Sequence, residues 1–175
     1  MSNLLRMVYV STTTHPVNQA NGGIQVDVGR ILMQSRKNNP SHEIGGVLYF
    51  ANNFFFQCLE GDQAAVNRVY NKIAEDPRHT NVQSVLVKRI NKRKFANWSM
   101  KYVALEHQVK QLLKENGFSA FSPYEFDEEM IDKMLNLFVT VSDDTSPADQ
   151  SYDQVTEEKP KQSILSRLFT RKSAA

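Results

Sequence analysis

The stretch IGGVLYFANNFFFQCLEG, residues 44–61, contains two apolar runs on either side of a short polar segment. The runs at 44–50 and 54–60 are rich in apolar, aromatic and β-branched residues, which favour strands. Ala51, Asn52 and Asn53 between them have the composition of a tight turn. The sequence therefore predicts an antiparallel β-hairpin over residues 44–60.

The second run of this hairpin contains one polar side chain, that of Gln57, between Phe56 and Cys58. A buried amide costs free energy unless its donors and its acceptor find partners. Two interpretations follow from the residues alone. Either Gln57 is a core polar group satisfied by the protein, or a bound ligand completes its hydrogen bonds.

The segments around the hairpin extend the pattern to the order βαββαββ. The expected elements are a strand at 4–11, a helix at 26–36, a helix that begins after Asp62, and strands at 82–90 and 98–105. Apolar residues recur at helical spacing in both helices, and Pro40 disfavours helix beyond Asn39. The order predicts an α+β fold, a ferredoxin-like sheet with both helices packed on one face.

Beyond Glu106 two further helical stretches are expected, at 107–116 and 127–141. Their apolar stripes need cover, so we expect them to pack on the sheet face that the first two helices leave open. The predicted organisation is a domain at 1–105, a helical extension at 106–142 and a disordered, charged tail at 143–175. The tail segment with Ile164, Leu165, Leu168 and Phe169 on one helical face is a candidate for membrane contact.

Composition excludes several classes of protein. The formal charge of +2 over 175 residues argues neither for a nucleic-acid binder nor for a carrier of acidic ligands, and the basic residues near 88–94 are expected to form a solvated hairpin tip. A single cysteine excludes an internal disulfide framework and suits a reducing cytoplasm. No apolar stretch approaches the roughly 20 residues needed to cross a bilayer. No metal-site spacing is present, and His15 and His42 are expected in solvated loops.

Alternation along the strands predicts which side chains share a face. Phe55, Gln57 and Leu59 share one face of their strand, and Met7, Tyr9 and Ser11 share one face of the first strand. Because the first and third strands are central neighbours in a ferredoxin-like sheet, Tyr9 and Gln57 are expected to touch. Trp98 and Met100 share a face of the last strand and are candidates to complete the same cluster, and the sequence leaves open which of the two lies next to Gln57. A redox-active aromatic ligand and a packed core both fit this cluster.

Five motifs in this order resemble those of BLUF domains, the blue-light sensors that use flavin. They are YVS at 9–11, KNN at 37–39, the hairpin at 44–61, IAEDPRH at 73–79 and RKFANWSM at 93–100. The resemblance covers roughly residues 4–105. It implies a noncovalently bound flavin, with FAD favoured and FMN possible.

The resemblance also assigns roles to individual residues. It implies that Tyr9 is the redox tyrosine and Gln57 the switching glutamine, with Trp98 and Met100 as the mobile pair near Gln57. The remaining residues that match flavin-contacting positions are Ile31, Asn38, Asn39, Ile73, Asp76, Arg78 and His79. An excited flavin would take an electron from Tyr9, and the proton would follow through Gln57, whose amide is both donor and acceptor.

The implied function is a short blue-light photoreceptor that is not an enzyme, forms a homo-oligomer and signals to a protein partner. Two alternatives remain: a flavin-free ferredoxin-like interaction module and a dark flavin oxidoreductase. The chain departs from the family pattern in a longer loop after the first strand, residues 12–25. It also has Gly45 where threonine is common, for which we expect weaker local hydrogen bonding.

Overall fold

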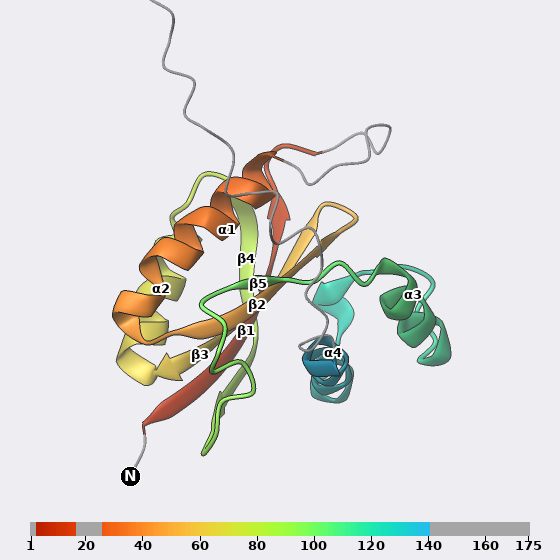
Figure 1. Ribbon diagram of the computed structural model, residues 1–175. Helices are drawn as coiled ribbons and strands as arrows, with labels where there is room; N and C mark the ends of the chain where they lie inside the picture. The colour runs from red at the N-terminus through yellow and green to blue at the C-terminus, as the bar shows by residue number, and fades with distance from the viewer. Residues whose placement is uncertain (1–2, 17–25, 141–175) are drawn as a thin grey trace, which may run out of the picture. The chain divides into compact units, whose positions relative to one another are not determined.

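The computed structural model describes residues 3–16 and 26–140, which form a five-stranded sheet with two helices on each face (Figure 1). The strands lie in the order β4-β1-β3-β2-β5. The strands are β1 (Leu4–Thr13), β2 (Gly45–Ala51), β3 (Phe54–Asp62), β4 (His79–Arg89) and β5 (Lys101–Tyr102). The helices are α1 (Val26–Asn38), α2 (Gln63–Ala74), α3 (Glu106–Glu115) and α4 (Glu128–Thr140), with 3-10 turns at Pro40–His42 and Pro123–Glu125. The predicted ferredoxin-like arrangement is confirmed.

The hairpin and the helix starts follow from local chemistry. Asn52 and Asn53 both have positive φ, at 51° and 66°, which two-residue turns of type I′ between strands require. Asp62 accepts hydrogen bonds from the backbone N–H groups of Ala64 and Ala65 at the start of α2, as expected for an N-cap.

The two faces of the sheet carry two separate cores. The first core packs α1 and α2 against the sheet through Val28, Ile31, Leu32, Ala65 and Val66, and it contains Tyr9 and Phe55 from the central strands. Side chains that alternate with these on the same strands, such as Val8, Val10 and Phe56, belong to the second core.

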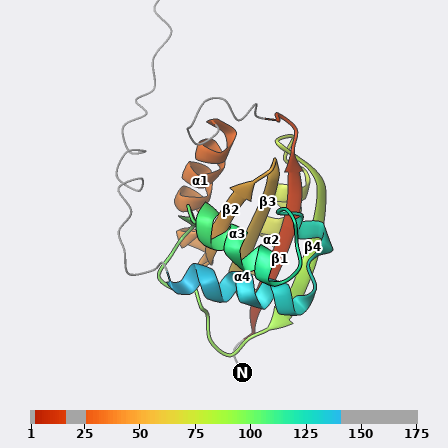
Figure 2. The same ribbon diagram turned by 90° about the vertical axis from the view of Figure 1, so that its right-hand side faces the viewer.

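The second core lies under α3 and α4, which cross the sheet face opposite to α1 and α2 (Figure 2). Met130, Ile131, Met134, Leu135 and Phe138 of α4 are all buried there. The expectation that the C-terminal helices cover this face is therefore confirmed. The expected disorder and membrane contact of the segment after 142 concern residues outside the described part of the chain.

Two strand predictions were wrong at their ends. β4 begins at His79, not at residue 82, because His79 and Thr80 continue the pairing with β1 past a register shift. β5 is limited to Lys101 and Tyr102, which pair in parallel with Val47 and Leu48 at the sheet edge, so most of the expected strand at 98–105 is absent.

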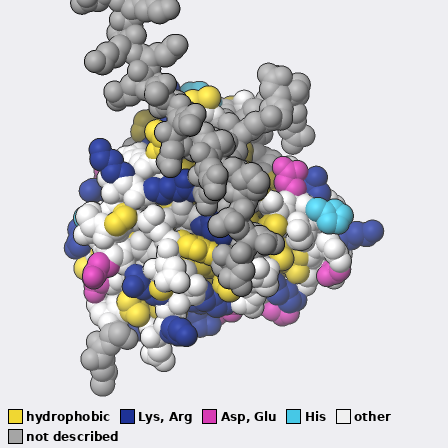
Figure 3. Space-filling model, viewed as in Figure 1, with side chains coloured by type: hydrophobic (Ala, Val, Ile, Leu, Met, Phe, Trp, Pro, Cys, Tyr) yellow, Lys and Arg dark blue, Asp and Glu magenta, His cyan; other side chains and the backbone are white. Residues whose placement is uncertain are grey.

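Figure 3 shows the distribution of charged side chains on one face of the molecule. Lys and Arg side chains are spread over that face among neutral and acidic ones, with no single basic stripe. Within residues 3–16 and 26–140, no helix has the length and apolar character that a membrane span requires.

We expect Phe138→Ala to lower the free energy of unfolding by about 3–5 kcal/mol, because the side chain is fully buried against Tyr49 and Phe56. Urea unfolding measures the change. Glu129→Ala, at an exposed position of the same helix, is the matched control and is expected to cost under about 1 kcal/mol. Equal, small effects of both substitutions would show that α4 is not part of the core.

Candidate functional site

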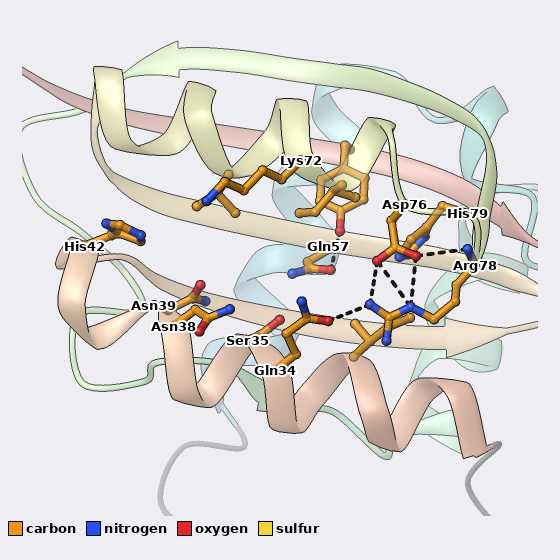
Figure 4. A pocket seen from close by; sticks show the side chains of 14 residues that line it. Gln34, Ser35, Asn38, Asn39, His42, Gln57, Lys72, Asp76, Arg78 and His79 are labelled. Carbon is orange, nitrogen blue, oxygen red and sulfur yellow. Dashed lines mark hydrogen bonds and ion pairs between the residues drawn. The ribbon is translucent and has the colours of Figure 1, made fainter.

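A cavity of about 230 Å³ lies between α1, α2 and the sheet (Figure 4). Nine residues singled out from the sequence line it: Tyr9, Ile31, Asn38, Asn39, Gln57, Ile73, Asp76, Arg78 and His79. They come from β1, β3, the start of β4, both helices and the segments that follow the helices. The structure therefore brings these candidate residues together around one space.

Tyr9 and Gln57 meet on the floor of the cavity. They are direct partners in the antiparallel pairing of β1 with β3, and both side chains are almost fully buried, at 0% and 1% exposure. The Tyr9 hydroxyl donates a short hydrogen bond to Oε1 of Gln57. The Gln57 Nε2 group donates to Sδ of Met100 at 3.6 Å, a weak acceptor.

Burial raises the pKa of Tyr9 well above its ordinary value, and the negative charge of Asp76 raises it further. The phenol is therefore protonated at every physiological pH and acts as the donor to Gln57. Its ring makes edge contacts with Tyr70, with 5.8 Å between centroids, and with His79, with 6.4 Å between centroids.

Asp76 and Arg78 form a charged pair at one end of the cavity. Nε of Arg78 donates to Oδ1 of Asp76 at 2.9 Å, and a terminal nitrogen of Arg78 donates to Oε1 of Gln34 at 2.6 Å. Hydrogen bonds from Arg78 lower the pKa of Asp76, and this pairing raises the pKa of Arg78. Both groups are charged, and Asp76 fixes the direction of the guanidinium group.

His79 is buried beside this pair, with its Nδ1 2.8 Å from Oγ of Ser11. Burial lowers the pKa of His79 to about 4, although the negative charge of Asp76 acts to raise it, and the Arg78 charge opposes protonation as well. The imidazole is therefore neutral at pH 7.

Asn39 lies where α1 ends, at the residue before Pro40, and its side chain is 2% exposed. Its Nδ2 donates to the carbonyl of Ser99 at 2.6 Å. Among the described residues, Oδ1 of Asn39 has no hydrogen-bond partner. Asn38, the preceding residue, lines the cavity but is exposed.

The sequence analysis missed five lining residues: Gln34, Ser35, His42, Val69 and Lys72. Helical spacing could have found most of them, because Gln34 and Ser35 follow Ile31 by three and four residues. Val69 and Lys72 precede Ile73 on the same face of α2. The expectation that His42 is solvated was wrong, since it is half-buried in a 3-10 turn at the cavity.

Only one member of the pair Trp98 and Met100 joins the Tyr9–Gln57 cluster. Met100 is buried in the first core, whereas Trp98 packs against the second core and stacks on Phe95 at 5.6 Å. The expectation that both share a face was wrong because residues 98–100 are not in a strand, so alternation does not apply to them.

The cavity has the properties of a site for a flat heterocycle. Ile31 and Ile73 supply aliphatic contacts from opposite helices, and polar groups lie around the rest of the lining. In the described part of the chain, one N–H of Gln57 and Oδ1 of Asn39 are buried without partners, which a ligand with donors and acceptors would satisfy. The fold and the site together define an α+β domain whose cavity between two helices fits a flat aromatic ligand.

The family comparison identifies this class. The model of the BLUF family, described as sensors of blue light using FAD, matches residues 4–101. The chain therefore belongs to the BLUF family, and FAD is the cofactor that the cavity and its buried amides fit. A flavin-free interaction module is set aside by this membership.

Relatives and solved structures agree. This chain is 33% identical over 100 residues to the photoactivated adenylate cyclase subunit beta of Euglena longa. The matched region covers 57% of this chain and 11% of that subunit. The blue light- and temperature-regulated antirepressor BluF of Escherichia coli (strain K12) is 28% identical over 126 residues, covering 67% of this chain and 31% of BluF. A structure of BlsA in its photo-activated state is 34% identical with a TM-score of 0.70, covering 78% of this chain and 94% of BlsA.

The low pKa of His79 predicts a specific loss of stability in acid. Between pH 6.5 and about 4 the unfolded chain binds a proton at His79 that the folded chain does not, so stability falls as pH decreases through this window. The expected loss is at most about 3 kcal/mol. Urea unfolding at pH 7, 5.5 and 4 measures it, and His79→Asn is expected to lose less stability than the wild type over this range. Parallel pH profiles of the two proteins would contradict the assignment.

Proposed function

We propose that Tyr9 and Gln57 are the photoswitch of this blue-light sensor and that its FAD lies in the cavity between α1 and α2. The observation that carries the proposal is the hydrogen bond from the Tyr9 hydroxyl to Oε1 of Gln57, within a fully buried pair on the cavity floor. A phenol and an amide joined in this way can pass a proton and exchange hydrogen-bond roles without a covalent bond to the cofactor.

The lining residues divide into those that sandwich a ring and those that bind its edge. Ile31 and Ile73 would contact the two faces of the ring system. Asn39 and Arg78 would hydrogen-bond its polar edge, with Arg78 oriented by Asp76. Three lining residues, Gln34, Asn38 and Lys72, are exposed. The Lys72 cation at this solvent-facing rim suits the phosphate groups of FAD.

The switch follows from the protonation states of these residues. Excited by blue light, FAD supplies a strong oxidant. Tyr9 keeps its proton in the dark because burial disfavours the phenolate, so the proton leaves only when an electron has also left. The proton would pass to Oε1 of Gln57 along the existing bond. Return of the electron and of a proton to Tyr9 would then restore the phenol, so the cycle would leave no net oxidation or reduction. Rotation or tautomerisation of the Gln57 amide then changes which group it donates to, and the apolar surroundings keep water from competing.

We further propose that the signal leaves through contacts with a protein partner and that the chain itself catalyses no reaction. BLUF proteins signal to partner proteins, and the relatives include a cyclase subunit and an antirepressor. In the described part of the chain, residues after Tyr102 form only α3, α4 and the connecting turns. Helices α3 and α4 are the proposed surface for the partner and for a second copy of the chain.

Gln57→Leu tests the switch, because leucine keeps the bulk of the side chain and removes its donor and its acceptor. We expect a folded, yellow protein whose flavin absorption does not shift to longer wavelength in blue light. Light-minus-dark absorption spectra measure the shift. The matched control is Gln111→Leu, at an exposed position of α3, which is expected to keep the wild-type shift. A wild-type shift in Gln57→Leu would show that Gln57 is only a core residue.

Tyr9→Phe tests the donor in the same experiment. Phenylalanine preserves the ring contacts with Tyr70 and His79 but has no proton to give. We therefore expect full flavin content and no stable red shift. A normal photocycle in this variant would refute the role assigned to Tyr9 and leave Gln57 without its proton source.

Asn39→Ala tests how the cofactor is held. Removing a buried amide that binds the ring edge is expected to weaken FAD binding by about 5- to 150-fold, from a loss of about 1–3 kcal/mol. Titration of the apoprotein with FAD measures the affinity, with thermal melts to follow folding. Asn38→Ala, at the exposed neighbouring position, is expected to have the smaller effect. Equal affinities of Asn39→Ala and the wild type would reject the contact.

A further inference from the structure

The segment 95–100, between β4 and β5, passes from the second core to the first within a few residues. Phe95 and Trp98 pack in the second core, under α3 and α4, whereas Met100 lies in the first core against Gln57. The residue at which the segment passes from one core to the other decides whether Trp98 or Met100 lies beside Gln57. Contacts elsewhere in the fold must therefore fix that residue.

Gly45, the first residue of β2, allows an unusually close approach of this segment. A Cβ at position 45 would lie 2.2 Å from the carbonyl oxygen of Phe95 and 3.3 Å from that of Trp98. Both are backbone atoms, so they cannot turn aside as a flexible side chain could. The neighbouring N–H of Gly46 donates to the Trp98 carbonyl at 2.9 Å. The sequence predicts only weaker local hydrogen bonding at Gly45. The structure shows a larger effect, because a side chain at this position would clash with the backbone of Phe95.

Glu60, in strand β3, also binds the backbone of Phe95. It is the cross-strand partner of Gly45, and its carboxylate is fully buried. Oε2 accepts a hydrogen bond from the N–H of Phe95 at 2.9 Å, and Oε1 accepts one from Nε of Arg6 at 2.6 Å. A buried carboxylate with both oxygens occupied by directional partners has a well-defined position.

The other end of the segment is tied to α1. Asn39 donates to the carbonyl of Ser99 at 2.6 Å, and Nε of Arg36 donates to the carbonyl of Met100 at 3.0 Å. Phe95 is thus held beside β2 and β3, and Ser99 and Met100 are held by α1, so the segment directs Met100 and not Trp98 toward Gln57.

We propose that Gly45 and Glu60 are positioning residues of the photoswitch, which hold Trp98 in the second core and thereby place Met100 beside Gln57. This inference rests on the function proposed above. A side chain at position 45 displaces the Phe95–Trp98 backbone, which frees Trp98 to move toward the cavity and withdraws Met100 from Gln57.

The chain contains one tryptophan, so its intrinsic tryptophan fluorescence reports Trp98 alone. A bound flavin quenches that emission more strongly the closer the indole lies. In the full chain with FAD bound, Gly45→Ala is expected to lower the Trp98 emission severalfold relative to the wild type at equal flavin content, and to change the dark-recovery rate. The matched control is Gly29→Ala, at a helical glycine where a Cβ meets no atom within 4 Å, and it is expected to behave as the wild type.

Glu60→Gln is the second variant, in case Gly45→Ala fails to fold or to bind FAD. The isosteric amide weakens the hold on the Phe95 N–H, so the same decrease of emission is expected to a smaller degree. Met100→Leu removes only the sulfur and is expected to change recovery while leaving Trp98 emission unchanged. Wild-type emission in both Gly45→Ala and Glu60→Gln would overturn the inference. Absence of a red shift in the wild type itself would instead overturn the proposed switch, so the two failures are distinguishable.

Discussion

The hydrogen bond between Tyr9 and Gln57 depends on the register of β1 against β3. A slip of one residue would turn Gln57 toward the second core and present a neighbouring phenylalanine or cysteine to the cavity. The register is fixed from both sides, because alternate residues of the two strands are buried in two separate cores. The helices on both faces therefore serve the proposed switch, including α4, none of whose residues lines the cavity.

Burial of Tyr9 and Gln57 strengthens the hydrogen bond between them and also costs desolvation free energy. A buried phenol and amide require partners, and the low local dielectric strengthens the bonds that they make. Gln57 has one strong partner in Tyr9 and one weak partner in the sulfur of Met100. An amide held by one strong and one weak bond can change its partners at a smaller cost than one held by two strong bonds. The weak hydrogen bond of Gln57 goes to Met100, in the segment that we propose Gly45 and Glu60 hold in place. Strand β3 therefore carries Gln57 on one face and Glu60, which anchors that segment, on the other.

Most of the fold and much of the cavity could be predicted from local patterns. The hairpin was evident from its turn residues and apolar runs, and strand alternation placed Tyr9 opposite Gln57. The position of Trp98 could not be predicted, because residues 98–100 leave the strand and alternation fails there. The close approach of Phe95 to Gly45 joins residues distant in sequence, and a glycine at the start of a strand carries no local signal of what contacts it.

Infrared spectroscopy of the side-chain amide tests the central claim most directly. The protein would be prepared with glutamine labelled with ¹⁵N in the side chain, and light-minus-dark difference spectra would be compared with those of unlabelled protein. The account predicts label-sensitive amide bands in the wild type that are absent from Gln57→Leu, because the hydrogen-bond partners of Gln57 change in the light. A red-shifted wild-type protein whose difference spectrum shows no label-sensitive band would contradict it.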